Sequence, residues 1–208
     1  MKLIDGKMTI IEVAPGIDLQ KDILDLMDFE PAISPELKTM DPGIFSEKWG
    51  GLDMTCLGLG ECDSHGNINV SRLGGNMVGP GGFIDITNAT PKVVFCGTFM
   101  GKAKLAIGDG KLTIVQEGKV RKFPKDVDQI TFAGKYIKPG QDVVYVTERC
   151  VMKLIDGTMT ITEIAPGIDL QKDILDLMDF TPAVAPDCKL MDERIFCETW
   201  GGLNEIFG

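Results

Sequence analysis

The sequence predicts a mixed α/β protein with a strand-rich core and helices supplied by two copies of one tail. Three observations support this fold class. The 208 residues are 44% hydrophobic and 25% charged, which is typical of a globular protein. Short β-favouring runs separated by Gly, Pro and Asp fill the middle of the chain. The stretch from Met1 to Leu52 recurs from Met152 to Leu203.

This repeat sets the expected domain organisation. The two copies are identical at 39 of 52 positions without a gap, which indicates a common origin. The offset of 151 residues is far longer than the period of a solenoid, about 20 to 50 residues, so it indicates a duplicated or permuted gene segment. We therefore expect a first tail copy (1–52), a core (53–151) and a second tail copy (152–208), packed into one compact domain.

Each tail copy should contain a strand followed by a helix. A β-rich run meets a Pro-Gly break, and Asp18 or Asp169 then stands where a helix N-cap is expected. In the first copy one apolar face is formed by Leu19, Ile23, Leu26 and Met27, and Pro31 ends the helix. Burying five or six such side chains stabilises by about 8 to 15 kcal/mol before entropy is subtracted, so neither copy should stay undocked.

The core is expected to be built of short strands, with the firm helices confined to the tails. Each candidate strand is an apolar or alternating run bounded by turn residues. The candidates are Met54–Gly60, Asn67–Ser71, Lys92–Cys96, Lys111–Gln116, Gln129–Phe132 and Asp142–Val151.

Charge and composition exclude several functions. A net charge of −10 makes nucleic acid and anionic membranes poor partners. The chain has no apolar run of about 18 residues and no signal-peptide pattern at its start. Six cysteines without C-x-x-C spacing favour reduced thiols and a cytoplasmic location. His65 is the only histidine, which rules out a multi-histidine zinc site.

The glycines cluster between Gly74 and Asp85. Backbone N–H groups in such a loop can approach a ligand oxygen closely, as an oxyanion hole requires, although a plain tight loop explains the same pattern. The phosphate-loop and dinucleotide-binding fingerprints are absent.

Two further groups of residues have ordinary explanations. Cys62 and His65 supply too few ligands for a structural metal site, so we expect no metal. Lys119, Arg121, Lys122 and Lys125 could meet ligand phosphates, but a solvated loop is the simpler interpretation.

Several longer motifs resemble the family I coenzyme A transferases, in particular the single-chain acetate/propionate type. They occur in the family's order and span most of the chain. The matching blocks are Gly60–Ser71, Gly79–Ile86, Val93–Phe99, Gln116–Lys119, Gln129–Phe132, Val146–Val151 and Glu163–Asp169.

This resemblance implies a fold and a chemistry. The fold is the β-half of the transferase, an open α/β sheet layered with helices. In the family a glutamate carboxylate attacks an acyl-CoA thioester, and a glutamyl-CoA thioester then passes CoA to a short-chain carboxylic acid. The CoA thioester is a substrate, and no further cofactor is implied. Gly79, Gly81 and Gly82 match the segment whose N–H groups stabilise the oxyanion and contact CoA.

The chain departs from the family at the catalytic residue. The family's nucleophilic glutamate lies in a Glu-x-Gly segment upstream of the stretch matched by 51–53, after an α-half, and both are absent here. Glu47 and Glu198 stand in the spacing E-x-x-G-G, and Glu61 matches a position that is not the nucleophile, so we assign no catalytic residue.

These departures predict a transferase-family protein that is inactive alone. A partner chain could supply the α-half, while the alternative is a non-catalytic interaction or assembly module with the same fold. Because two tails share one expected docking groove, we also predict a homo-oligomer formed by tail exchange.

Overall fold

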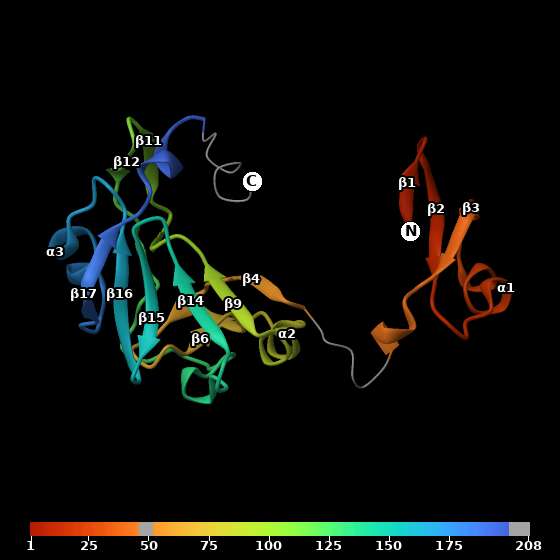
Figure 1. The fold of residues 1–208 in the computed structure, drawn as a ribbon, viewed down its shortest axis with the longest axis horizontal. Coiled ribbons are helices and arrows are strands. Elements are labelled where there is room, and N and C mark those ends of the chain that lie inside the picture. Colours follow the sequence, from red (N-terminus) through yellow and green to blue (C-terminus); the bar gives the residue numbers. More distant parts are fainter. Residues whose placement is uncertain (46–51, 200–208) are drawn as a thin grey trace. The chain divides into compact units, whose positions relative to one another are not determined.

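The computed structural model describes residues 1–45 and 52–199, and Glu47 lies outside this part of the chain. It divides into two compact units, Met1–Gly51 and Leu52–Gly208, which are treated separately below (Figure 1). The second unit contains the core together with the second tail copy.

Unit 1 is the first tail copy and forms a three-stranded sheet in the order β1-β2-β3. Strand β2 pairs antiparallel with β1 and parallel with β3. Its elements are β1 (Lys2–Ile4), β2 (Lys7–Val13), α1 (Leu19–Asp22), the 3-10 turn η1 (Leu24–Leu26), β3 (Ala32–Thr39) and η2 (Pro42–Phe45).

The continuous helix predicted after Asp18 is wrong. The N-cap itself is as expected, because the Asp18 carboxylate accepts the Lys21 N–H at 2.8 Å. After one turn the backbone leaves helical geometry at Ile23, with φ −128°, and resumes as the 3-10 turn η1. A helix of four residues is not stable by itself in water. Its length is therefore set by packing within the folded protein and not by the spacing of the apolar residues in the sequence.

Unit 2 is built on a six-stranded sheet in the order β17-β16-β15-β14-β9-β4 (Figure 1). Strands β4, β9 and β14 run parallel, β14, β15 and β16 alternate in direction, and β17 is parallel to β16. The bounds are β4 (Met54–Gly58), β9 (Lys92–Cys96), β14 (Asp142–Val146), β15 (Cys150–Ile155), β16 (Thr158–Ile164) and β17 (Ala183–Leu190). This mixed sheet confirms the predicted α/β class.

Short hairpins and helices surround the sheet. The strands are β5 (Glu61–Cys62), β6 (Ile68–Asn69), β7 (Arg72–Leu73), β8 (Asn76–Met77), β10 (Met100–Gly101), β11 (Lys104–Gly108), β12 (Lys111–Gln116) and β13 (Val120–Arg121). The helices and 3-10 turns are α2 (Phe83–Ala89), η3 (Gly134–Tyr136), α3 (Leu170–Asp173), η4 (Leu175–Leu177) and η5 (Glu193–Phe196).

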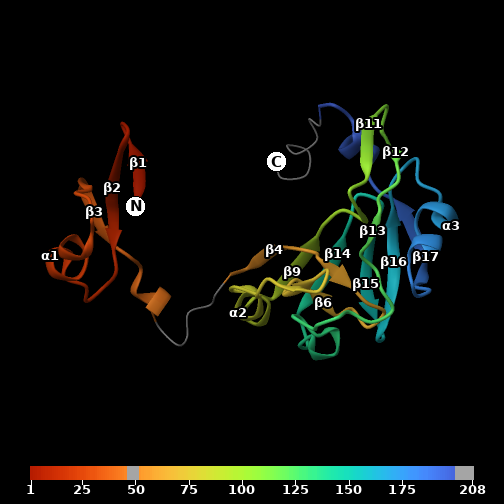
Figure 2. The ribbon, with the colours of Figure 1, turned by 180° about the vertical axis from the view of Figure 1, so that it is seen from behind.

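Three predictions about the core need correction. Asp142–Val151 is two strands, because Thr147 Oγ1 accepts the N–H groups of Arg149 and Cys150 and closes a turn between them. Gln129–Phe132 is no strand and contributes only an isolated bridge from Phe132 to Ile68. Helices are not confined to the tails, since α2 lies in the core (Figure 2).

The main hydrophobic core lies on one face of the six-stranded sheet. Phe95 is fully buried in β9, and its ring contacts those of Phe83, Phe132 and Tyr145 at centroid distances of 5.0 to 5.6 Å. Phe83 comes from α2, so this helix covers the same face that carries Tyr145. Within residues 1–45 and 52–199, no helix has the length and hydropathy that a membrane span requires.

Candidate functional site

The glycine loop between β8 and α2 is exposed and adopts a backbone that favours glycine. Gly79 and Gly81 have φ angles of +82° and +54°, in the left-handed region that other residues rarely adopt. Gly82 has φ −80° and is the N-cap of α2. No atom lies within 4 Å of a Cβ built on Gly79 or Gly81, so backbone conformation rather than crowding requires glycine there.

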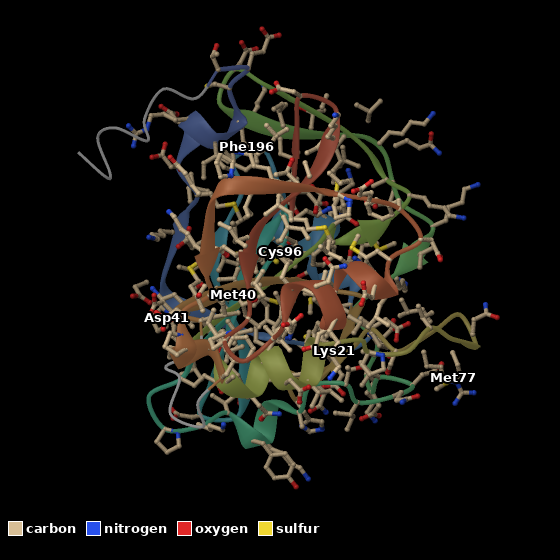
Figure 3. The ribbon with its side chains drawn as sticks, turned by 90° about the vertical axis from the view of Figure 1, so that its right-hand side faces the viewer. Lys21, Met40, Asp41, Met77, Cys96 and Phe196 are labelled. Atoms are coloured by element: carbon tan, nitrogen blue, oxygen red, sulfur yellow. The ribbon has the colours of Figure 1, made fainter. Side chains whose placement is uncertain are left out.

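Buried polar residues hold the base of this loop. The Ser71 carbonyl accepts the N–H groups of Val78 and Gly79 at 2.8 and 3.2 Å. The Ser71 hydroxyl lies 2.9 Å from Thr131 Oγ1, and the buried amide of Asn69 accepts the Ser71 N–H at 3.1 Å. The loop is therefore anchored to the core, while Met77 in β8, just before the loop, projects from the surface (Figure 3) and is 68% exposed.

Two backbone N–H groups near the end of the loop have no hydrogen-bond acceptor among the described residues. No described residue accepts a hydrogen bond from the N–H groups of Gly81 or Gly82, whereas the next N–H group, that of Phe83, donates to Pro80 at 3.1 Å. Two adjacent exposed backbone donors can bind a carbonyl oxygen or an oxyanion of a ligand.

Cys62 and His65 lie in different environments. Cys62 is fully buried, and burial raises the pKa of its thiol well above the usual value. His65 is exposed, and its backbone N–H donates to the carboxylate of Asp63, which also accepts from Asn67 and Val127. This aspartate thus organises a turn. Among the described residues, no group of three His, Cys, Asp or Glu side chains could hold a metal ion.

Arg121 of the basic run contacts the second tail, which was not anticipated from the sequence. Arg121 Nη1 lies 2.8 Å from the Asp179 carboxylate, and Nη2 donates to the Asp176 carbonyl at 3.2 Å. Lys122 is half-buried and donates to the Thr98 carbonyl at 3.1 Å. A hint was available in the acidic tail residues Asp176 and Asp179, whose charge complements that of the run.

Arg149 forms a second unanticipated contact with the tail. Its guanidinium is fully buried, binds both oxygens of Glu117 at 2.7 and 3.0 Å, and lies 3.3 Å from Glu148. It also donates to the Asp173 carbonyl at 2.8 Å and lies over the ring of Phe99. The hydrogen bond from Arg149 lowers the pKa of Glu117.

The remaining glutamate candidates show no catalytic arrangement. Glu61 is half-buried and accepts a hydrogen bond from the Asn69 amide at 2.8 Å. Glu198 is exposed after η5. Neither belongs to the glycine loop, and no nucleophile is assigned.

Comparison with known proteins identifies relatives of this sequence and fold. Caffeate CoA-transferase of Acetobacterium woodii is 57% identical over 165 residues, covering 76% of this chain and 32% of that protein. Acetate CoA-transferase YdiF of Escherichia coli O157:H7 is 52% identical over 72% of this chain and 28% of the relative. The chain belongs to the family I CoA-transferases. The crystal structure of the YdiF acyl-CoA transferase apoenzyme superposes with a TM-score of 0.71 and 51% identity, over 74% of this chain and 30% of that one.

The match to these CoA-transferases is partial. The chain spans about a third of the length of the curated relatives it matches. A C56V variant of the decarboxylase AibA/AibB shares the fold at 15% identity and a TM-score of 0.52, over 81% of this chain and 61% of that one. No protein-family profile matches the chain.

Proposed function

We propose that this chain forms part of a CoA-transferase β-half and that its Gly79–Gly82 loop binds the thioester end of an acyl-CoA. The observation that carries this proposal is the pair of unpaired N–H groups on Gly81 and Gly82, on an exposed loop anchored to the core. Relatives named caffeate and acetate CoA-transferase support CoA as the transferred group and a carboxylic acid as the acceptor.

In the proposed reaction a glutamate carboxylate attacks the thioester carbonyl carbon, and CoA thiolate leaves to give an acyl-glutamyl anhydride. The thiolate then attacks the glutamyl carbonyl and releases the first carboxylate. The resulting glutamyl-CoA thioester passes CoA to the acceptor acid by the reverse sequence. The Gly81 and Gly82 N–H groups would donate to the oxygen that carries negative charge in each tetrahedral intermediate.

The nucleophile would come from a partner polypeptide. A face of the sheet that unit 2 itself leaves partly exposed supports such a partner, since parallel strands are usually covered on both faces. Val144, Val94 and Cys56 align across β14, β9 and β4 on the face opposite the main core. Val144 and Val94 are half-buried, while Cys56 on the edge strand β4 and Cys96 on the neighbouring strand β9 are exposed.

The proposal is tested by titrating the isotopically labelled 208-residue chain with CoA and with acetyl-CoA. The amide signals of Gly81 and Gly82 should shift saturably on adding acetyl-CoA, and that of Gly108 should not. Gly81→Val should weaken this response more than Gly108→Val, because Gly108 has no positive φ and open space around its Cβ position. Unshifted loop amides at saturating acetyl-CoA would contradict the assignment.

The same chain should show no acetyl transfer to a short carboxylate without a partner, because the family's nucleophile segment is absent. A glutamyl-CoA adduct trapped with borohydride or hydroxylamine would refute that part of the proposal. The duplicated tail favours a second candidate, a non-catalytic assembly module. Such a module would show association with a partner but no response of the loop to acetyl-CoA.

A further inference from the structure

The first tail copy reproduces the backbone of the second in detail. The turn after β1 has φ angles of +48° and +76° at Asp5 and Gly6, and its counterpart has +49° and +76° at positions 156 and 157. The strand registers are the same, with Lys2 opposite Thr9 and their counterparts paired likewise at an offset of 151. The first copy is therefore a folded replica of a module that is docked in unit 2.

The sequence differences between the copies avoid the docked face. The copies differ at 13 of 52 positions, all described in the second copy, and none of these 13 residues is buried there. Among the described residues of the second copy, 152–199, ten are buried, and all ten are identical in the first. In the second copy they are Met152, Met159, Thr160, Ile161, Ala165, Ile174, Met178, Pro182, Met191 and Phe196.

Several of these apolar side chains are exposed in the first copy. Phe45 is 59% exposed, whereas its counterpart Phe196 is 4% exposed. Met1 is 59% exposed, whereas its counterpart Met152 is fully buried. Unit 1 by itself therefore leaves Met1 and Phe45 exposed, whereas Thr9, Ile10 and Pro31 are buried in both copies.

In the second copy, an extended core segment fills part of this face. The Asp179 carboxylate pairs with Arg121 at 2.8 Å, and the Asp179 N–H donates to the Phe123 carbonyl at 2.9 Å. The Phe123 side chain is fully buried in the same cluster as Ile174 and Met178. The tail therefore recognises an arginine followed two residues later by phenylalanine.

The equivalent place in the first copy is hollow. A cavity of about 400 Å³ is lined by Leu24, Met27, Asp28 and Phe29, among others, and every lining residue belongs to unit 1. Asp28 is the counterpart of Asp179 and makes no ion pair or side-chain hydrogen bond to any described residue. The hollow combines apolar side chains with Gln20 and two carboxylates, Asp28 and Glu30, and Asp28 stands at the position of Asp179.

We propose that this hollow binds an extended Arg-x-Phe segment of a transferase-like core that has no tail of its own. The carboxylate of Asp28 would pair with the arginine, its N–H would donate to the phenylalanine carbonyl, and Met27 would cover the ring. The partner is a separate polypeptide rather than another copy of this chain. In this chain the segment is already occupied by the second tail, so exchange between copies leaves the number of docked faces unchanged and buries no additional area.

The test uses the full labelled chain and a synthetic peptide with the sequence of residues 117–127. The amides around Met27 and Asp28 should shift saturably, and those around Asp179 should stay unchanged because that site is filled. A peptide with Phe123→Ala should bind at least about tenfold more weakly, since it loses a buried aromatic side chain. Asp28→Asn should weaken binding about two- to fivefold, and the matched variant Asp179→Asn should leave it unchanged.

Three results would overturn the proposal. The first is no saturable shift at residues 24–29. The second is equal loss of peptide binding in Asp28→Asn and Asp179→Asn. The third is concentration-dependent dimerisation without peptide that shifts the same amides, because the occupant would then be a second copy of this chain. Acetyl-CoA binding at the glycine loop is measured separately, so either proposal can fail alone.

Discussion

Replacing Arg149 by alanine should destabilise unit 2 more than any exposed charge substitution. The guanidinium has no exposed surface and makes a two-oxygen contact with Glu117, a contact with Glu148 and a hydrogen bond to the Asp173 carbonyl. Removing one partner of a buried ion pair leaves the other charges uncompensated, which typically costs about 3 to 5 kcal/mol. Glu117 keeps 38% of its side chain exposed and can be rehydrated, so we expect the lower end, about 3 kcal/mol.

The measurement is urea unfolding followed by the reaction of Cys150 with a thiol reagent. Cys150 is fully buried beside Arg149, so its labelling reports the opening of unit 2 and not of unit 1. Arg194→Ala is the control, because its ion pair with Asp192 is exposed to solvent and contributes little to stability. If the two variants lose the same free energy of unfolding, Arg149 does not hold the tail in the way the geometry indicates.

Three further outcomes are expected. The stabilisation by Arg149 should be fully present at pH values above the ordinary glutamate pKa of about 4.3, and it should be lost as the pH falls through the lowered pKa of Glu117. Urea titrations of wild type and Arg149→Ala at several pH values measure this difference. Cys56 and Cys96 should react with a thiol reagent at pH 8 before Cys150, whose pKa burial raises to about 12, and peptide mass mapping would show the order. Gly81→Val should cost about 1 to 2 kcal/mol because φ is positive there, whereas Gly82→Ala should change the urea midpoint little, and equal shifts would contradict the loop assignment.

Features set by neighbouring residues could be predicted from the sequence. The Asp18 and Asp169 caps form as expected, since the carboxylate and the N–H it accepts are three residues apart. Strands 92–96 and 111–116 match their apolar runs. The positive φ angles at Gly79 and Gly81 are consistent with a glycine-rich turn, although the role of the loop in binding stays a prediction.

Features decided by distant contacts could not be predicted in this way. Helix α2 contains β-branched residues and asparagine, which are poor helix formers. It forms because Phe83 and Thr87 are buried, and the Phe83 ring stacks on that of Phe95 in β9 at a centroid distance of 5.6 Å. The sequence around Arg149 likewise does not indicate its ion pair, because the partner Glu117 lies 32 residues earlier in the chain.

The duplicated tail separates local from tertiary effects within one molecule. Both copies break the helix at the same residue, with φ −128° at Ile23 and −127° at Ile174, although Ile174 is fully buried and Ile23 is only half-buried. The break therefore does not depend on docking against the core, and the contacts within each copy are sufficient to produce it. Docking instead decides how much of the apolar face is covered, as the 76% exposure of Leu26 and the half-buried state of its counterpart Leu177 illustrate. A tail that is folded before it meets a core loses less conformational entropy on binding, which makes the first copy suited to recognise a separate partner.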